Sequence, residues 1–187
     1  MSVQWAETRK WLLVGLGLVI AWGAFVTSQG PRFGGAGEAP DLKGTALAFP
    51  AEFNWKMNGL DGSSVEFAKF RGRPILLNIW ATWCPPCVEE MPTLARLASN
   101  PRIKEKDVAV VCVSMDDSLD TVRKFVADKG WGMTILHSTS LPPVFQTDGI
   151  PATFLIAPDG RVAATTVGSA RWDDPSVVAF LEKLSTP

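Results

Sequence analysis

Two cysteines, Cys84 and Cys87, are separated by two prolines and lie between an apolar run and a helical pattern. The apolar run covers residues 75–81, so the order of patterns predicts a strand, a sharp turn and the start of a helix. A helix N-terminus carries unpaired backbone N–H groups and the positive end of the helix dipole, and it therefore stabilises a thiolate relative to a thiol. Cys87 falls one helical turn beyond Cys84, so the two sulfurs can face each other. The pair predicts a cycle between dithiol and disulfide.

Two other uses of this cysteine pair have less support. Zinc needs two further ligands at suitable spacing, and the remaining candidates, Cys112 and His137, form no second close pair. A purely structural disulfide across two residues would close too small a loop to restrict the unfolded chain much. Cys112 lies among valines, which favours a buried apolar role, and His137 is expected to be an ordinary residue after a strand. The sequence indicates no metal site.

The composition limits the possible functions. The chain has 187 residues, of which 47% are hydrophobic and 20% are charged, and its formal net charge is −1. This size fits one domain plus an additional segment. The near-neutral charge gives no electrostatic signature of nucleic-acid binding. With three cysteines, the chain is not a disulfide-scaffolded secreted module.

An uncharged apolar run follows Arg9 and Lys10 and ends at Val26. A membrane-spanning helix needs about 17–25 apolar residues, and this run is at the lower limit. The preceding cations predict a cytoplasmic N-terminus, with the rest of the chain outside the cytoplasm. A cleaved signal peptide is the alternative, and it would export the chain as well. We expect an uncleaved membrane anchor over residues 1–27 and a flexible linker, rich in Gly, Ala and Pro, over residues 28–46.

Residues 47–187 show the pattern of one α/β domain. We expect strands at 53–57, 64–67, 75–81, 108–114, 133–136, 153–156 and 162–167, and helices at 85–99, 118–129 and 174–184. Turn residues at 58–62 and 157–161 predict two hairpins, and Pro92 should bend the first helix. This order of elements, which opens with a β-hairpin and ends with a helix, predicts an α/β sheet with an antiparallel end.

Several segments of the domain together match a known pattern. Residues 78–87, continuing into Glu90, and residues 149–154 with their central proline carry most of it, and residues 168–172 add to it. The chain resembles the thioredoxin-fold family, in its exported, membrane-anchored branch of TlpA/ResA/CcmG-like thiol–disulfide oxidoreductases. The resemblance covers about residues 47–185. It implies a thioredoxin fold with an N-terminal β-hairpin extension, preceded by a single transmembrane or signal-anchor helix.

The resemblance implies a role for each residue of the site. Cys84, at the exposed edge of the turn, would be the nucleophile, and the deeper Cys87 would resolve the mixed disulfide. Asn78 stands where thioredoxin itself has a buried acid, and Glu90 matches the acid to which this branch assigns proton transfer. A solvated carboxylate on the helix surface is the alternative for Glu90. Pro151 matches the cis proline beside the two sulfurs.

Substrate contacts are expected around the two sulfurs. Trp83 would offer an apolar platform to partners, and the backbone of Ile150 could pair with an extended substrate. Pro85 and Pro86 would stiffen the turn beneath the partner. For Trp80, shielding of the site and plain core packing are both open.

The resemblance implies an exported, membrane-tethered reductase of protein disulfides, with no cofactor beyond the Cys84–Cys87 disulfide. Its clients would be oxidised proteins on the periplasmic side, such as apocytochrome c during cytochrome c biogenesis or a copper-site protein, and a transmembrane thiol donor would supply electrons. A Cu(I) metallochaperone using the same cysteines is one alternative, although only His137 could add a histidine ligand. A thiol peroxidase is the other, although Ala81 stands where that family has Thr or Ser.

Overall fold

The computed structural model describes residues 37–42 and 49–185. The anchor predicted over residues 1–27 lies outside the described residues, as does most of the predicted linker. Within the part of the chain that the structure describes, no helix has the length and apolar character needed to span a membrane.

The described residues form a mixed sheet of eight strands, in the order β1-β8-β7-β4-β5-β6-β2-β3. The strands are β1 (Phe49–Pro50), β2 (Lys56–Gly59), β3 (Ser64–Glu66), β4 (Ile75–Trp80), β5 (Ala109–Ser114), β6 (Thr134–His137), β7 (Ala152–Ile156) and β8 (Arg161–Val167). Strand β4 is parallel to β5, and β5 is parallel to β6. Strand β7 runs antiparallel to both of its neighbours, β4 and β8. The thioredoxin fold expected from the sequence, with its antiparallel end, is therefore present.

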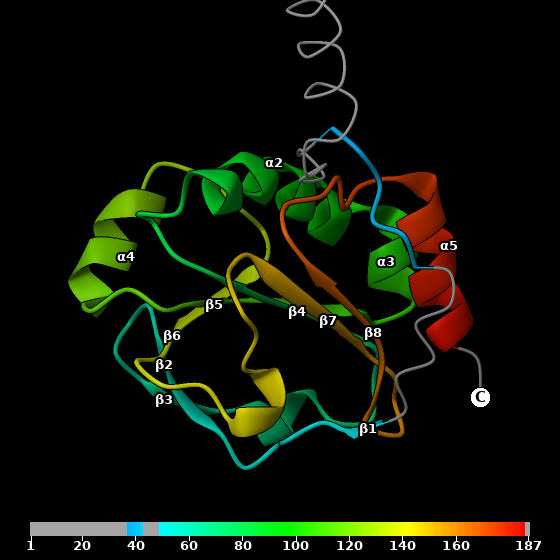
Figure 1. The fold of residues 1–187 in the computed structure, drawn as a ribbon, viewed down its shortest axis with the longest axis horizontal. Helices are drawn as coiled ribbons and strands as arrows, with labels where there is room; N and C mark the ends of the chain where they lie inside the picture. Colours follow the sequence, from blue (N-terminus) through cyan, green and yellow to red (C-terminus); the bar gives the residue numbers. More distant parts are fainter. Residues whose placement is uncertain (1–36, 43–48, 186–187) are drawn as a thin grey trace, which may run out of the picture. The chain divides into compact units, whose positions relative to one another are not determined.

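The helices lie mostly on one face of this sheet (Figure 1). The α-helices are α2 (Pro85–Ser99), α3 (Pro101–Glu105), α4 (Leu119–Val126) and α5 (Pro175–Leu184), and the 3₁₀ helices are η1 (Phe67–Phe70) and η2 (Pro143–Phe145). The α-helices cover the face drawn uppermost in Figure 1, and the two 3₁₀ helices lie on the other face.

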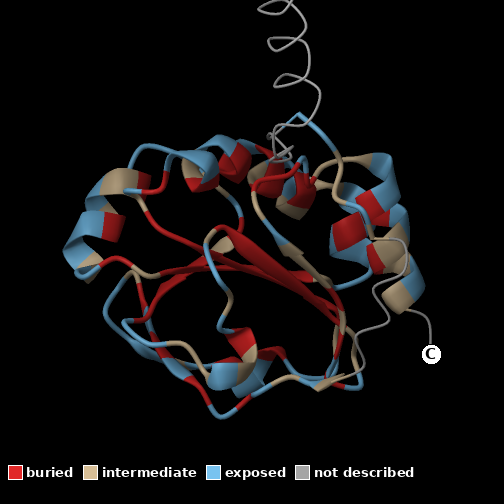
Figure 2. Cartoon of the chain, in the orientation of Figure 1, coloured by how far each residue is buried: buried red, intermediate tan, exposed pale blue. Residues whose placement is uncertain are grey.

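Strand β4 separates two apolar cores. Leu76 and Trp80 pack toward the α-helices, whereas Leu77 and Ile79 pack toward the aromatic residues of the opposite face. This alternation follows from the two-residue period of a strand. All residues of β4 and β5 are buried, as expected for central strands covered on both faces (Figure 2). The backbone at the end of β4, where the active-site turn begins, is thus held in place by packing on both faces.

The N-terminal hairpin is present, but its first strand is shorter than expected. Strand β2 begins at Lys56, and Phe53 and Trp55 before it also pack into the core. Phe53 stacks on Phe67 with ring centroids 5.3 Å apart, and Trp55 lies 5.8 Å from the same ring. These aromatic contacts hold the segment before β2 against the core.

Three short elements were not expected from the sequence: β1, α3 and η2. Helix α3 begins after Asn100, whose side chain accepts a hydrogen bond from the backbone N–H of Arg102 at 2.9 Å. Residues 37–42, which fall in the predicted linker, contact the domain: the backbone N–H of Arg171 donates to Glu38 O at 2.7 Å, and Leu42 packs against the core beneath the α-helices.

Candidate active site

The cysteine pair lies where β4 passes into α2. Strand β4 ends at Trp80, and Cys84 caps the N-terminus of α2 with its sulfur, which accepts from the backbone N–H of Cys87 at 3.3 Å. A proline in the first turn suits this position, because the N–H that it lacks would have no partner inside the helix. Cys84 and Cys87 form a disulfide, with their Cα atoms 5.3 Å apart. The structure therefore represents the oxidised protein.

Cys84 is less accessible than the sequence suggests. Its exposed fraction is 5%, against 0% for Cys87, so the expectation that Cys84 lies at an exposed edge is wrong for the oxidised state. The physical reason is that its sulfur turns inward, to Cys87 and to the loop before β7, where Ile150 O lies 3.7 Å away. Cys84 is still the more accessible of the two sulfurs.

The loop opposite the disulfide contains a cis peptide bond between Ile150 and Pro151, as the resemblance implies. Pro151 is buried, and its carbonyl accepts from the backbone N–H of Gly168 at 2.8 Å. Ile150 is half-buried, with its carbonyl beside Cys84. This loop therefore forms one wall of the site.

Glu90 is fully buried, and the alternative of a solvated carboxylate is wrong. Its Oε1 accepts from Asn78 Nδ2 at 2.7 Å. Its Oε2 accepts from the backbone N–H of Ala170 and from Trp172 Nε1, both at 2.9 Å. Burial raises the pKa of Glu90 from 4.5 to about 7, and the three hydrogen bonds oppose that rise. This carboxyl group can take up or release a proton near neutral pH.

Asn78 connects Glu90 to the sheet. Its Nδ2 also donates to Thr153 Oγ1 on β7, at 2.9 Å, so a single amide group joins α2, β4 and β7. Its Oδ1 has no hydrogen-bond partner within the described residues. The amide thus replaces the buried acid of thioredoxin and presents a donor to the carboxylate.

Residues 168–174, called here the approach segment because they lead into α5, form a further part of the site that residue spacing did not reveal. Ala170 and Trp172 contact Glu90 across 80 and 82 residues of sequence. The backbone N–H of Trp172 also donates to Thr93 Oγ1 on α2, at 3.1 Å. The only sequence signal was that residues 168–172 resemble TlpA proteins.

Sequence reasoning also missed Asp116, a buried residue after β5. Its carboxylate accepts from the backbone N–H and the hydroxyl of Thr82, which stands two residues before Cys84. His137 is the last residue of β6 and is buried, with Nε2 2.7 Å from Asp116 O. Spacing along the chain gives no signal for these contacts, because they connect the ends of different strands: Asp116 follows β5, Thr82 follows β4 and His137 ends β6.

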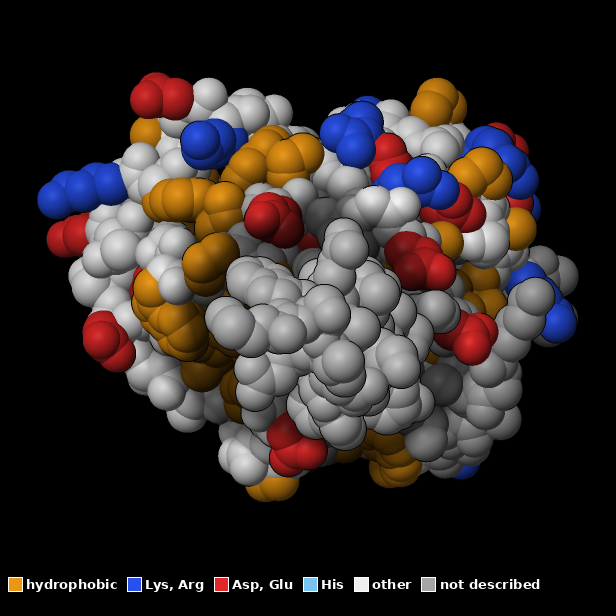
Figure 3. Space-filling model, turned by 45° about the horizontal axis from the view of Figure 1, so that its top comes forward, with side chains coloured by type: hydrophobic (Ala, Val, Ile, Leu, Met, Phe, Trp, Pro, Cys, Tyr) orange, Lys and Arg blue, Asp and Glu red, His pale blue; other side chains and the backbone are white. Residues whose placement is uncertain are grey.

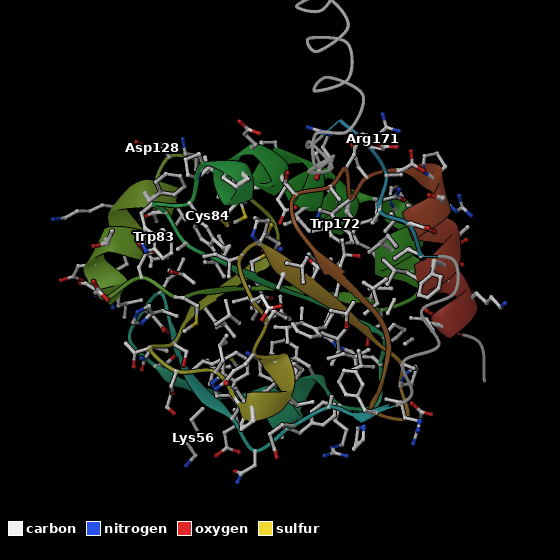
Figure 4. All side chains as sticks on the ribbon, in the orientation of Figure 1. Lys56, Trp83, Cys84, Asp128, Arg171 and Trp172 are labelled. Atoms are coloured by element: carbon white, nitrogen blue, oxygen red, sulfur yellow. A yellow bond between two sulfur atoms is a disulfide. The ribbon has the colours of Figure 1, made fainter. Side chains whose placement is uncertain are left out.

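The surface around the disulfide is partly apolar. Trp83 is 64% exposed, and Pro85 and Pro86 beside it are also exposed. Trp80, by contrast, is wholly buried, which favours core packing over shielding. In Figure 4, Cys84 lies between Trp83 and Trp172. Figure 3 shows hydrophobic side chains exposed between scattered charges of both signs.

Cys112 is buried on β5, directly opposite Asn78 of β4 in the sheet register. Burial raises the pKa of its thiol strongly, and the nearby charge of Glu90 adds to the rise. Its sulfur lies 3.7 Å from the sulfur of Met133. In the described ranges, no group of three or more His, Cys, Asp or Glu side chains is arranged to hold a metal ion.

A mixed sheet of this topology, with a redox-active disulfide at the start of the helix after its central strand, is a thioredoxin fold, and this chemistry makes the chain a thiol–disulfide oxidoreductase. The match to the Redoxin family model extends over residues 36–181. The chain belongs to the Redoxin family.

Known proteins agree with this assignment. A thiol-disulfide oxidoreductase ResA of Bacillus cereus is 32% identical over 134 residues, which cover 71% of this chain and 75% of that protein. Among solved structures, a thiol-disulfide oxidoreductase from Bacteroides vulgatus shares the fold, with a TM-score of 0.64, 24% identity, and coverage of 75% of this chain and 99% of that chain. A thiol:disulfide interchange protein DsbE from Chlorobium tepidum has a TM-score of 0.61 and 26% identity, with coverage of 74% and 94%.

Proposed function

We propose that this chain is an exported protein-disulfide reductase, held at the cell membrane by an anchor within residues 1–27, with its redox domain on the periplasmic side. The observation that carries the exchange chemistry is Glu90, a buried carboxyl group whose pKa lies near 7, three residues after Cys87 on the same helix. The reducing direction is supported by the resemblance to the TlpA/ResA/CcmG branch. Positions three apart on a helix are neighbours on its surface. Glu90 is therefore placed to take the proton that Cys87 must lose before it can attack.

The proposed reaction starts from the reduced pair. The Cys84 thiolate attacks one sulfur of a client disulfide, the client S–S bond breaks, and one client thiolate leaves. Cys87 then gives its proton to Glu90 and attacks the Cys84 sulfur, which releases the second client thiolate. Two electrons have passed to the client, and the enzyme is left with the Cys84–Cys87 disulfide present in this structure.

The walls of the site have distinct roles in this proposal. Trp83, Pro85 and Pro86 offer an exposed apolar surface to the client. The backbone of Ile150, beside Cys84, offers a hydrogen-bonding edge to an extended client segment. Pro151 closes the site next to the sulfurs.

A reductase outside the cytoplasm needs an electron supply, which we assign to a transmembrane thiol donor. The resemblance to the TlpA/ResA/CcmG branch supports clients such as apocytochrome c or a copper-site protein. The apolar run that ends at Val26, with cations before it, supports the membrane anchor and the orientation of the chain.

The reduction potential of the Cys84/Cys87 pair tests this proposal. The full chain in detergent would be equilibrated with defined ratios of reduced and oxidised dithiothreitol, and the fraction of disulfide measured by thiol trapping. A value near or below that of thioredoxin, about −270 mV, is expected for a reductase. A value near that of a strong oxidant, about −120 mV, would overturn the direction of electron flow.

A further inference from the structure

Glu90 is held from outside its own helix chiefly by the approach segment. Trp172 Nε1 and the backbone N–H of Ala170 both donate to Oε2 at 2.9 Å, while Asn78 serves Oε1. Trp172 is itself fully buried, so water does not replace its indole N–H in the folded protein. Both donors to one oxygen therefore come from a single short stretch of chain.

The approach segment is tied firmly to α2. The backbone N–H of Trp172 donates to Thr93 Oγ1 at 3.1 Å, and the same hydroxyl donates to Glu90 O at 2.8 Å. Arg96, further along α2, pairs with Asp173 at 2.6 Å. The indole is thus fixed relative to the helix that carries both Cys87 and Glu90.

Buried carboxylates normally hold their proton, because removal from water penalises the charged form. The hydrogen bonds from Trp172, Ala170 and Asn78 act in the opposite sense and lower the pKa of Glu90, and the bond from Trp172 lowers it most. The charge of Glu90 also acts on the Cys112 thiol of β5, and Cys87 precedes Glu90 by three residues on α2. In the described part of the chain, no charged side chain takes over the task of these donors.

We propose that Trp172 is a positioning residue for the proton acceptor: its indole N–H, together with the backbone N–H of Ala170, fixes one oxygen of Glu90 and keeps that carboxyl group able to ionise inside the core. This inference rests on the proposed role of Glu90 in taking the proton of Cys87. Through Glu90, Trp172 would influence when Cys87, the resolving cysteine, can react.

The test measures the resolving step of the reduced protein, with the aromatic disulfide dithiobis(nitrobenzoate) as the client. Attack by Cys84 releases one coloured thionitrobenzoate, and attack by Cys87 on the mixed disulfide releases the second. The pH dependence of the second release is compared in the wild type, Trp172→Phe and Trp80→Phe. Trp80 is the matched control, because it is equally buried in the same core while its indole N–H has no partner among the described residues.

Loss of one hydrogen bond to a charged group is expected to raise the midpoint of the second release by about one pH unit or more in Trp172→Phe. The first release should keep its pH dependence, and Trp80→Phe should keep both. The shift caused by Trp172→Phe should also vanish in a Glu90→Gln background. An equal shift in Trp80→Phe, no shift at all, or a shift that persists with Glu90→Gln would overturn the positioning role.

A second measurement separates this inference from the proposed function. The Glu90 carboxyl ¹³C resonance and the Trp172 indole N–H resonance are titrated together in the unmodified protein. A common midpoint is expected, and an indole resonance that ignores the titration of Glu90 would overturn the inference even if Trp172→Phe failed to fold. If Glu90→Gln left the second release unchanged, the proton role of Glu90 would fall, while this titration would still decide whether Trp172 holds the carboxylate.

Discussion

Thr82 and Asp116 are joined by two hydrogen bonds. The Thr82 hydroxyl donates to Asp116 Oδ1 at 2.6 Å, and the Thr82 backbone N–H donates to Oδ2 at 3.0 Å. The Ser114 hydroxyl adds a third bond to Oδ2 at 2.6 Å. The end of β5 thus fixes the turn that leaves its neighbour β4 and leads to Cys84.

Replacement of Asp116 should therefore weaken both the fold and the site. In Asp116→Ala the buried donors of Thr82 lose their acceptor, and we expect the free energy of unfolding to fall by about 2–4 kcal/mol. Because the turn loses its support, the reaction of Cys84 with a disulfide should slow as well. Urea unfolding and stopped-flow exchange measure the two effects. Asp117→Ala changes the exposed neighbouring acid and should alter neither; equal effects of the two variants would refute the bracing role of Asp116.

The raised pKa of Glu90 predicts a pH dependence of stability. The unfolded chain releases this proton near 4.5, whereas the folded chain retains it to about pH 7. Between these values the folded state binds more protons, so stability falls as pH rises. The contribution is complete below about pH 4.5 and is lost as pH passes about 7, for a total of about 3 kcal/mol.

Denaturant unfolding of the oxidised protein at about pH 5 and about pH 8 measures this change. Glu90→Gln is the control, because an amide of the same shape does not titrate, and it should remove most of the decrease. A wild-type protein that is equally stable at both pH values would show that Glu90 does not titrate near neutral pH.

Cys112 should not react in the folded protein. It is buried, and its raised pKa keeps it a neutral thiol, whereas thiolates are the reactive species. Iodoacetamide added to the reduced native protein should therefore label Cys84 first and leave Cys112 unlabelled until denaturant is added. Peptide mapping by mass spectrometry identifies the labelled residue. Rapid labelling of Cys112 without denaturant would contradict its assigned burial.

Trp83 should matter for protein clients more than for stability. Because 64% of its surface is exposed, Trp83→Ala should change the free energy of unfolding by no more than about 0.5 kcal/mol. Loss of an aromatic contact should slow exchange with an oxidised peptide by about two- to tenfold, while exchange with glutathione disulfide is unchanged. Val167→Ala changes another large exposed hydrophobic residue and serves as the control. Equal slowing with peptide and glutathione would argue against a docking role.

The sequence predicted the central elements well because their patterns are local. The apolar run of residues 75–81 became β4 (Ile75–Trp80), and the helix expected at residues 85–99 became α2 with the same bounds. The cis bond before Pro151 could be expected only through the family resemblance, because most X–Pro bonds are trans. The predicted membrane anchor lies outside the described residues and stays a prediction.

The missing parts of the site depend on contacts between distant segments. Trp172 meets Glu90 across 82 residues, and Asp116 meets Thr82 across 34 residues. Neither pair shares a helix face or a strand, so no periodicity in the sequence marks it. The burial of Cys84 was missed for a similar reason, because it depends on the loop at Ile150.

The position of Cys112 in the middle of β5 has a consequence for the redox behaviour of the whole chain. Three cysteines allow three different pairings, and two of them would trap the enzyme in a dead-end bridge. A disulfide to Cys112 would require a central strand, buried along its entire length, to leave its place between β4 and β6. Oxidation therefore yields a single isomer, and the domain should titrate as one two-electron couple without a disulfide isomerase to correct it.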